Sequence, residues 1–316
     1  MNQPSSSLII GGGGLLGNAV IAELRRRGRS ARRARVRWES ESDAGADLAT
    51  ELEDAAQAGG DLDLWWCAGA GVTATGADRL AVELNVFSAF VDQVADLAAR
   101  HPAKVTLLLA SSAGAVYAGS PDPPFTEQTT PIPLSDYGRQ KLRAESVAAR
   151  LVSAGVGVAI ARIANLYGPG QDLSKPQGLM SQLCLSAQLR RPMNIYVSLD
   201  TLRDYVHVAD AAARCVSLLD AVSAGEPACV IKIVCTGRSV SVGALLSEAN
   251  RIYRRRIPVV LAASPLGRQQ ARDLRLRSVV LPELDQVPTH TITAGLGQVR
   301  RAVEASTRTG RQTPAR

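Results

Sequence analysis

The sequence predicts an α/β fold: a doubly wound parallel sheet of the Rossmann type with a smaller C-terminal substrate lobe. Three observations indicate it. Short apolar runs alternate with longer segments of helical periodicity along the first half of the 316 residues. These runs are nearly continuous, which is typical of parallel strands buried on both faces. A glycine-rich turn follows the first run directly, as it does in dinucleotide-binding folds.

Each element follows from a local pattern. "SSLIIGGGG" predicts a strand that ends in a tight turn, and "LLGNAVIAELRRRG" predicts a helix that ends at Gly28. Further strands are expected at 62–71, 104–114 and 156–170, and further helices at 79–100 and 137–155. We expect a dinucleotide-binding domain over 5–165, a partly interleaved substrate lobe over 166–302 and a disordered tail over 303–316.

The composition narrows the class of protein. Hydrophobic residues make up 46% of the chain and charged residues 21%, values typical of a soluble globular protein. The N-terminus has no basic region followed by a long apolar run, so we expect neither secretion nor a membrane partner. Five scattered cysteines show no metal-ligand spacing, which predicts reduced thiols, a cytoplasmic location and no metal site.

The net charge of +7 is concentrated in part in "RRRGRSARRARVR" at 25–37. A nucleic-acid partner is not expected, because aromatic residues are not interleaved with these arginines and only Trp38 lies nearby. Two interpretations stay open: a solvated basic face, or a pocket for one phosphate group.

Gly11, Gly14 and Gly17 form a GxxGxxG turn after the first strand. Glycine permits the turn and lets backbone N–H groups approach a pyrophosphate, while Leu15 and Leu16 begin the helix behind it. The turn therefore predicts NAD(P) binding.

The second strand bears on the choice between NAD and NADP. An acidic residue about 20 positions after the glycines would bind the ribose 2′-hydroxyl. Arginines stand there instead, including Arg33 and Arg35, and the first acid is Glu39. Because guanidinium groups bind phosphate bidentately, the sequence favours NADP.

Tyr137 and Lys141 lie four residues apart on one predicted helix face. Lysine is rare in this chain: among 36 basic residues it occurs only at 104, 141, 175 and 232. A nearby ammonium stabilises a phenolate and can donate to ribose hydroxyls, roles for which a planar guanidinium is less suited. The pair predicts proton exchange with an alcohol. Ser112 follows the preceding strand, and its hydroxyl could hold the substrate oxygen or serve only the turn; Ser111 is the alternative.

Six sequence motifs together resemble those of a known protein family. The sequences "IIGGGGLLG", "DLDLWWCAGA", "ASSAGAVYA", "PIPLSDYGRQKLRAE", "ARIANLYGPGQ" and "LRDYVHVADAA" occur in this order. The chain resembles the extended short-chain dehydrogenases/reductases, in particular the nucleotide-sugar epimerase/dehydratase family, over about residues 7 to 250.

The resemblance implies roles for individual residues. Tyr137, Lys141 and Ser112 would form the catalytic triad. The other implied cofactor contacts are Asp47 and Leu48 at the adenine ring, Ala68, Gly69 and Ala70 along the cofactor, and Ile163 at the nicotinamide.

The substrate contacts are less determined. Asn165 resembles a substrate-phosphate or sugar contact, although asparagine before a turn is also a common capping residue. Arg203 either meets a nucleotide diphosphate or pairs with Asp204 or Asp210. His207 is expected to be a packed core histidine.

The resemblance implies a nucleotide-sugar epimerase that oxidises a sugar hydroxyl transiently, and a homodimer. The Asp–Glu pair typical of dehydratases is missing from "SSAGAV", which disfavours a 4,6-dehydratase. An NADPH-dependent 4-ketoreductase would use the same residues, so both activities stay open. A non-catalytic NADP-binding regulatory protein is a third possibility, which the intact Tyr–Lys pair disfavours.

Overall fold

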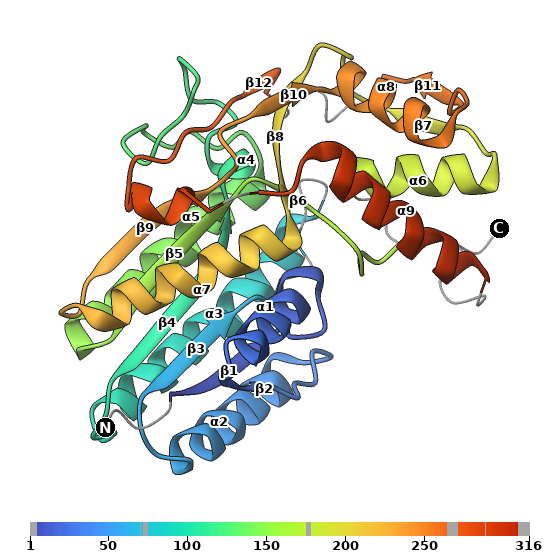
Figure 1. Cartoon of the computed structure of the whole chain (residues 1–316). Coiled ribbons are helices and arrows are strands. Elements are labelled where there is room, and N and C mark those ends of the chain that lie inside the picture. The colour runs from blue at the N-terminus through green and yellow to red at the C-terminus, as the bar shows by residue number, and fades with distance from the viewer. Residues whose placement is uncertain are drawn as a thin grey trace.

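A six-stranded parallel sheet forms the centre of the molecule and confirms the predicted doubly wound fold (Figure 1). The computed structural model describes residues 5–69, 71, 75–174, 178–263, 271–287 and 289–308. The strand order is β2-β1-β3-β4-β5-β9. The strands are β1 (Ser6–Ile10), β2 (Ser30–Arg33), β3 (Leu62–Trp66), β4 (Val105–Ser112), β5 (Gly157–Ile163) and β9 (Cys229–Val234).

Helices cover both faces of this sheet, and each face has its own core. Ile9 of β1 packs into the core under α1 (Leu15–Arg26) and α7 (Val208–Ala224). Leu8 and Ile10 point to the other face because side chains alternate along a strand. That face is covered by α2 (Glu41–Gln57), α3 (Ala77–Ala98) and α5 (Asp136–Ala149).

The strand order places a crevice at the carboxyl ends of β1 and β3. From β1 the chain moves to one side to form β2, and then crosses back to form β3 and β4 on the other side. Ligands of open α/β sheets bind where the strand order reverses in this way. A single helix, α2, connects β2 to β3.

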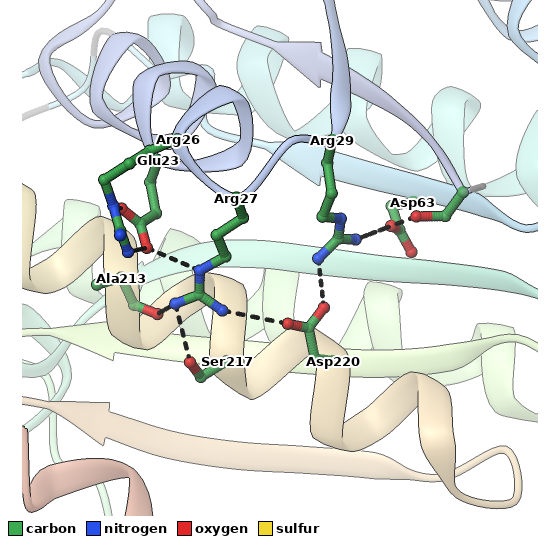
Figure 2. A network of polar contacts seen from close by, with 9 residues as sticks. Glu23, Arg26, Arg27, Arg29, Asp63, Ala213, Ser217 and Asp220 are labelled. Carbon is green, nitrogen blue, oxygen red and sulfur yellow. Dashed lines mark hydrogen bonds and ion pairs between the residues drawn. The ribbon is translucent and has the colours of Figure 1, made fainter.

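At the opposite end of these strands, arginines connect distant elements (Figure 2). Arg27 donates to Asp220 (3.3 Å) and Ser217 (3.1 Å) of α7. Arg29 donates to Asp220 (2.5 Å) and to the buried carboxylate of Asp63 in β3. Several arginines of the basic segment 25–37 are therefore neutralised within the fold and hold α7 to the sheet.

The second lobe contains short strands and three packed helices. Its elements are β6 (Asn165–Tyr167), α6 (Leu179–Leu189), β7 (Met193–Ile195), β8 (Leu202–His207), β10 (Ser239–Ser241), α8 (Val242–Tyr253), β11 (Val259–Leu261), β12 (Asp273–Leu274) and α9 (Ile292–Arg308). Helices α6, α8 and α9 share one apolar core. Between these elements the chain returns to the large sheet as α7 and β9, so the two lobes are interleaved in sequence.

The C-terminal helix extends past the boundary that the sequence predicted between the substrate lobe and the tail. Helix α9 continues to Arg308, so it includes the first six residues that were assigned to the tail, and Val303 is buried against α6. An apolar residue at a helical interval from Leu296 and Val299 explains the extension. Residues 309–316 lie outside the described part of the chain.

Among the described residues, the remaining short elements are α4 (Ala113–Val116) and the 3₁₀ helices Arg150–Ala154 and Pro282–Asp285. Among the described residues, none of the helices combines the length and the apolar character needed to cross a bilayer. All five cysteines are free thiols, in agreement with the sequence.

Candidate active site

The glycine-rich turn is built for close backbone approach. Gly11 has a φ of +80°, and a Cβ there would lie 2.4 Å from the backbone nitrogen of Ala68 at the end of β3. A Cβ on Gly17 would lie 2.4 Å from the carbonyl oxygen of Gly11. The N-cap of α1 is Gly14, which provides no side-chain acceptor for the N–H groups that follow. Leu15 begins the helix and Leu16 is buried behind the turn, so the N–H groups of the first turn lack a side-chain cap.

A cleft of about 530 Å³ opens beside this turn. Five residues that the sequence assigned to the cofactor line it: Gly11, Gly14, Ala68, Gly69 and Lys141. Ala70 lies outside the described residues. The turn, the end of β3 and α5 are thus brought together around one elongated space, as binding of a dinucleotide requires.

The sequence predicted that Asp47 and Leu48 contact the cofactor, but neither residue reaches this cleft. Both lie inside α2, where Leu48 is fully buried in the core. The carboxylate of Asp47 accepts two hydrogen bonds from the Arg37 side chain, which lower the pKa of Asp47 to about 2. The resemblance implied that this pair meets the adenine ring, whereas Ser40 caps a helix that runs through the pair.

Other residues occupy that part of the cleft. They are Trp38, Glu39, Ser40, Glu41 and Ala44, all from the segment that enters α2. The sequence did not predict these residues as part of a site. The signal that could have found them is a tryptophan directly after an arginine-rich strand.

The arginines at the end of β2 differ in their surroundings. Arg32 pairs with Glu51 at 2.9 Å and Arg37 with Asp47 at 2.8 Å. Arg33 instead packs over Gly12 of the glycine-rich turn and donates to Asn18 at 2.6 Å. Within the described ranges, no ion pair forms to the guanidinium of Arg33 or Arg35. These two exposed cations are therefore available to a ligand.

The Tyr137–Lys141 pair lies in the first turns of α5. Ser135 caps the helix by accepting from the N–H of Gly138 at 3.2 Å. A Cβ on Gly138 would lie 2.4 Å from the carbonyl oxygen of Ala115, so glycine lets α5 lie against α4. Lys141 Nζ lies 5.6 Å from the centre of the Tyr137 ring and donates to the carbonyl of Ala110 in β4 at 3.3 Å.

The structure separates the two candidate serines. Ser111 is buried and donates to Glu145 at 2.5 Å, so its hydroxyl is committed to the core. Ser112 is half-buried and accepts a 3.4 Å hydrogen bond from the N–H of Ala115 as the N-cap of α4. Its partner on the adjacent strand is Ile163. Of the two, Ser112 is the residue whose hydroxyl keeps capacity for a substrate.

Beneath this region lies a buried polar network. Arg162 and Glu145 form a bidentate pair with distances of 2.6 and 3.1 Å, and their side chains are about 5% exposed. Arg162 also donates to the hydroxyl of Tyr117 at 2.6 Å. The network connects β4, β5 and α5, the three elements that carry Ser112, Ile163 and Lys141.

A second cavity of about 560 Å³ lies in the smaller lobe and brings Asn165 and Arg203 together. Asn165 donates to the backbone carbonyl of Asp204 at 3.0 Å. Arg203 is 8% exposed and donates to the backbone carbonyl of Leu202 at 2.8 Å. Burial lowers the pKa of Arg203, a sign that the charged form is poorly solvated.

Neither aspartate that the sequence offered as a partner of Arg203 pairs with it. The carboxylate of Asp204 accepts from Thr236 and from the N–H of Arg238. Asp210 pairs with His290 at 2.7 Å. No salt bridge to Arg203 is found in the described part of the chain, so a buried cation faces the cavity and favours an anionic ligand.

His207 is buried, as expected, and its position beside Asp210 and His290 deserves a test as a metal site. The two imidazole rings stack with centroids 4.0 Å apart and an angle of 24°. Ring lone pairs lie in the ring plane, so nearly parallel rings do not direct them at one ion. Burial and the neighbouring His290 lower the pKa of His207 to about 4. We interpret the group as packing between β8, α7 and the segment before α9.

Comparison with known proteins gives three results. The family model described as "NAD dependent epimerase/dehydratase family" matches residues 7–233. The chain is 32% identical to a dTDP-4-dehydro-6-deoxyglucose reductase of Escherichia coli over 105 residues, 33% of each protein. It is 28% identical to UDP-glucose 4-epimerase 4 of Oryza sativa subsp. japonica over 170 residues, 49% of this chain and 46% of the relative.

These matched segments span a third to about half of the relatives' lengths. Among solved structures, MoeE5 in complex with UDP-glucose and NAD superposes with a TM-score of 0.79. The superposition covers 96% of this chain and 99% of that one at 21% sequence identity, which shows a common fold.

Proposed function

This chain belongs to the NAD-dependent epimerase/dehydratase family, and from that premise we propose that it is an NAD(P)-dependent nucleotide-sugar epimerase. The observation that carries the proposal is the Tyr137–Lys141 pair on α5, with Lys141 lining the cleft beside the glycine-rich turn. The residues of the cleft fit a dinucleotide, because the small residues Gly11, Gly14 and Ala68 line it and let a pyrophosphate approach the backbone. When bound, the nicotinamide ring supplies an acceptor and donor of hydride.

The chain's own residues would move the proton. Tyr137 takes the proton from a sugar hydroxyl as a phenolate and returns it as a phenol, and the Lys141 ammonium stabilises the phenolate form. Ser112 donates its hydroxyl proton toward the same substrate oxygen and holds it in place. The hydrogen bond from Lys141 to the Ala110 carbonyl fixes the ammonium on the strand that carries this serine.

The second cavity would take the nucleotide diphosphate. Arg203 offers a buried guanidinium to the phosphates, and Asn165 lies in the same cavity. The relatives and the solved structure carry UDP- or dTDP-sugars in their names, which supports this class of substrate.

A ketoreductase is the second candidate, favoured by the match to a reductase over a third of the chain. The two activities differ in whether the keto sugar leaves the site before hydride returns. Mass spectrometry of the purified protein, followed by incubation with a panel of UDP- and dTDP-sugars, distinguishes them. We expect tightly held cofactor and sugar interconversion without net consumption of cofactor. Stoichiometric oxidation of added NADPH would identify a ketoreductase, and cofactor binding without turnover a regulatory protein.

We also propose that Arg33 and Arg35 favour NADP over NAD. Each charge-assisted hydrogen bond to the 2′-phosphate contributes roughly 1.5–3 kcal/mol, or about one to two powers of ten in affinity. Glu39 and Glu41 line the cleft, whereas Arg33 and Arg35 are not among its lining residues. The two carboxylates would oppose a phosphate, so the preference depends on which charges reach the 2′ position.

Titrations with NADPH and NADH at two salt concentrations test this preference. We expect tighter NADPH binding that weakens with salt and fades in Arg33→Ala or Arg35→Ala. Arg32→Ala is the matched control, because Arg32 is already paired with Glu51. Equal binding of the two cofactors by the unmodified protein would show that the arginines are only a basic surface.

A further inference from the structure

Trp38 is the exposed member of the chain's three tryptophans. Its side chain is 51% exposed, whereas Trp65 and Trp66 are at most 6% exposed. It lies on the rim of the cofactor cleft and meets the ring of Trp66 edge-on, with centroids 6.3 Å apart. An exposed apolar ring at the edge of a cleft is typical of a surface that binds a ligand.

The chain holds Trp38 in place from both sides. On one side, Arg37 is tied to α2: its backbone N–H donates to Asp47 at 2.8 Å and its guanidinium pairs with the same carboxylate. On the other side, Ser40 is the N-cap of α2 and accepts from the N–H of Asp43 at 3.0 Å. The segment between is therefore ordered before any ligand arrives, which lowers the entropic cost of binding.

The walls around Trp38 suit a flat aromatic ligand. Trp66, Phe87 and Val86 line the same cleft, and the Trp66 ring packs against Phe87 with centroids 4.7 Å apart. Glu41 contributes a carboxylate that can accept from an amino group at the edge of such a ring. Apolar faces with a few polar groups are typical of sites for heteroaromatic rings.

The sheet order indicates which ring of the cofactor this is. Trp38 follows β2, whereas Lys141 donates to a carbonyl of β4, and β1 with its glycine-rich turn lies between these strands. A dinucleotide whose pyrophosphate lies at the turn places its reacting ring toward Lys141 and Tyr137. Its other base then lies on the β2 side.

We propose that Trp38 stacks on the adenine ring of the cofactor and replaces the contact that Asp47 and Leu48 cannot make from within α2. This inference rests on the proposed function, because it assumes that the cleft takes NAD or NADP. Trp38 is then a specificity-determining residue for the adenine half of the cofactor.

Fragments of the cofactor test the proposal without any turnover. We would titrate the full-length protein with AMP, nicotinamide mononucleotide and NAD(P), by calorimetry and by tryptophan fluorescence. In Trp38→Ala, affinity for AMP and for the dinucleotide should fall roughly 5- to 100-fold, the range that base–aromatic stacking implies. Affinity for nicotinamide mononucleotide should be unchanged, and Trp38→Phe should recover most of the loss.

Leu261→Ala is the matched control, because Leu261 is 60% exposed and is not among the residues that line either cavity. Its AMP affinity should equal that of the unmodified protein. AMP should quench the fluorescence of the unmodified protein and of Leu261→Ala, and quench Trp38→Phe much less.

Unchanged AMP affinity in Trp38→Ala would overturn the proposed stacking of Trp38 on adenine and leave the proposed function intact. An equal loss for AMP and nicotinamide mononucleotide would also overturn it, by showing a general disturbance of the cleft. If the unmodified protein binds neither dinucleotide, the proposed function is wrong, and the proposed stacking of Trp38 is wrong with it.

Discussion

Tyr137→Phe should lower turnover by a factor on the order of 10²–10⁴ while cofactor affinity stays near that of the unmodified protein. The change deletes one hydroxyl and leaves the aromatic ring against Gly71 and Lys141 in place. Only the group that exchanges the proton is lost, so chemistry should suffer and binding should not. Steady-state kinetics with the identified sugar nucleotide and a separate cofactor titration measure the two effects.

Lys141→Arg tests the second half of the pair. The positive charge is kept, but a planar fork replaces a compact ammonium that donates to the Ala110 carbonyl from a half-buried position. We expect activity to fall by a similar factor. Lys104→Arg is the matched control, since Lys104 is exposed and donates to carbonyls at the end of α7. Full activity of Lys141→Arg would refute the role assigned to this lysine.

Glu145→Ala should lower the free energy of unfolding by about 3–5 kcal/mol, the usual cost of leaving one partner of a buried ion pair uncompensated. The substitution leaves the buried guanidinium of Arg162 without its carboxylate partner. It also removes the acceptor of the Ser111 hydroxyl. Urea denaturation measures the loss. Since the pair connects β5 to α5, residual activity should fall with stability even at temperatures where the variant is folded.

The control for this prediction is an exposed pair. Asp92 and Arg150 lie 2.8 Å apart with side chains nearly 60% exposed, so Asp92→Ala should change the free energy of unfolding by only about 0–1 kcal/mol. The double variant Glu145→Leu, Arg162→Met should be more stable than Glu145→Ala, because no charge is left buried. If Glu145→Ala were as stable as Asp92→Ala, the network would not contribute as its burial implies.

Features that depend on near neighbours in the chain could be predicted from the sequence. The alternation of apolar runs and amphipathic helices gave the parallel sheet, because strand and helix periods are local properties. The glycine-rich turn belongs with them, since a turn is determined by its own residues. Tyr137 and Lys141 could be paired in advance because four residues make about one turn of a helix.

For Asp47 and Leu48, the prediction made from a short motif was wrong. Their motif implied a contact with the adenine ring, but Ser40 as N-cap and the apolar spacing of Ala44, Leu48 and Leu52 specify a helix. The consequence for the cleft, that Trp38 and Glu41 line it, depends on how α2 packs against β1 and α3. No pattern within the segment contains that information.

The sequence by itself determined the class of fold, the family and the pairing of Tyr137 with Lys141 on one helix, which we propose to be catalytic. Only the tertiary structure decided that Ser111 is committed to Glu145, that Arg203 is left without an acidic partner, and that Arg33 lies over Gly12. Each outcome depends on a residue elsewhere in the chain, or on the lack of one among the described residues. A charged or hydroxyl side chain has several candidate partners in sequence, and packing selects among them because an unsatisfied buried group costs more than any one hydrogen bond contributes.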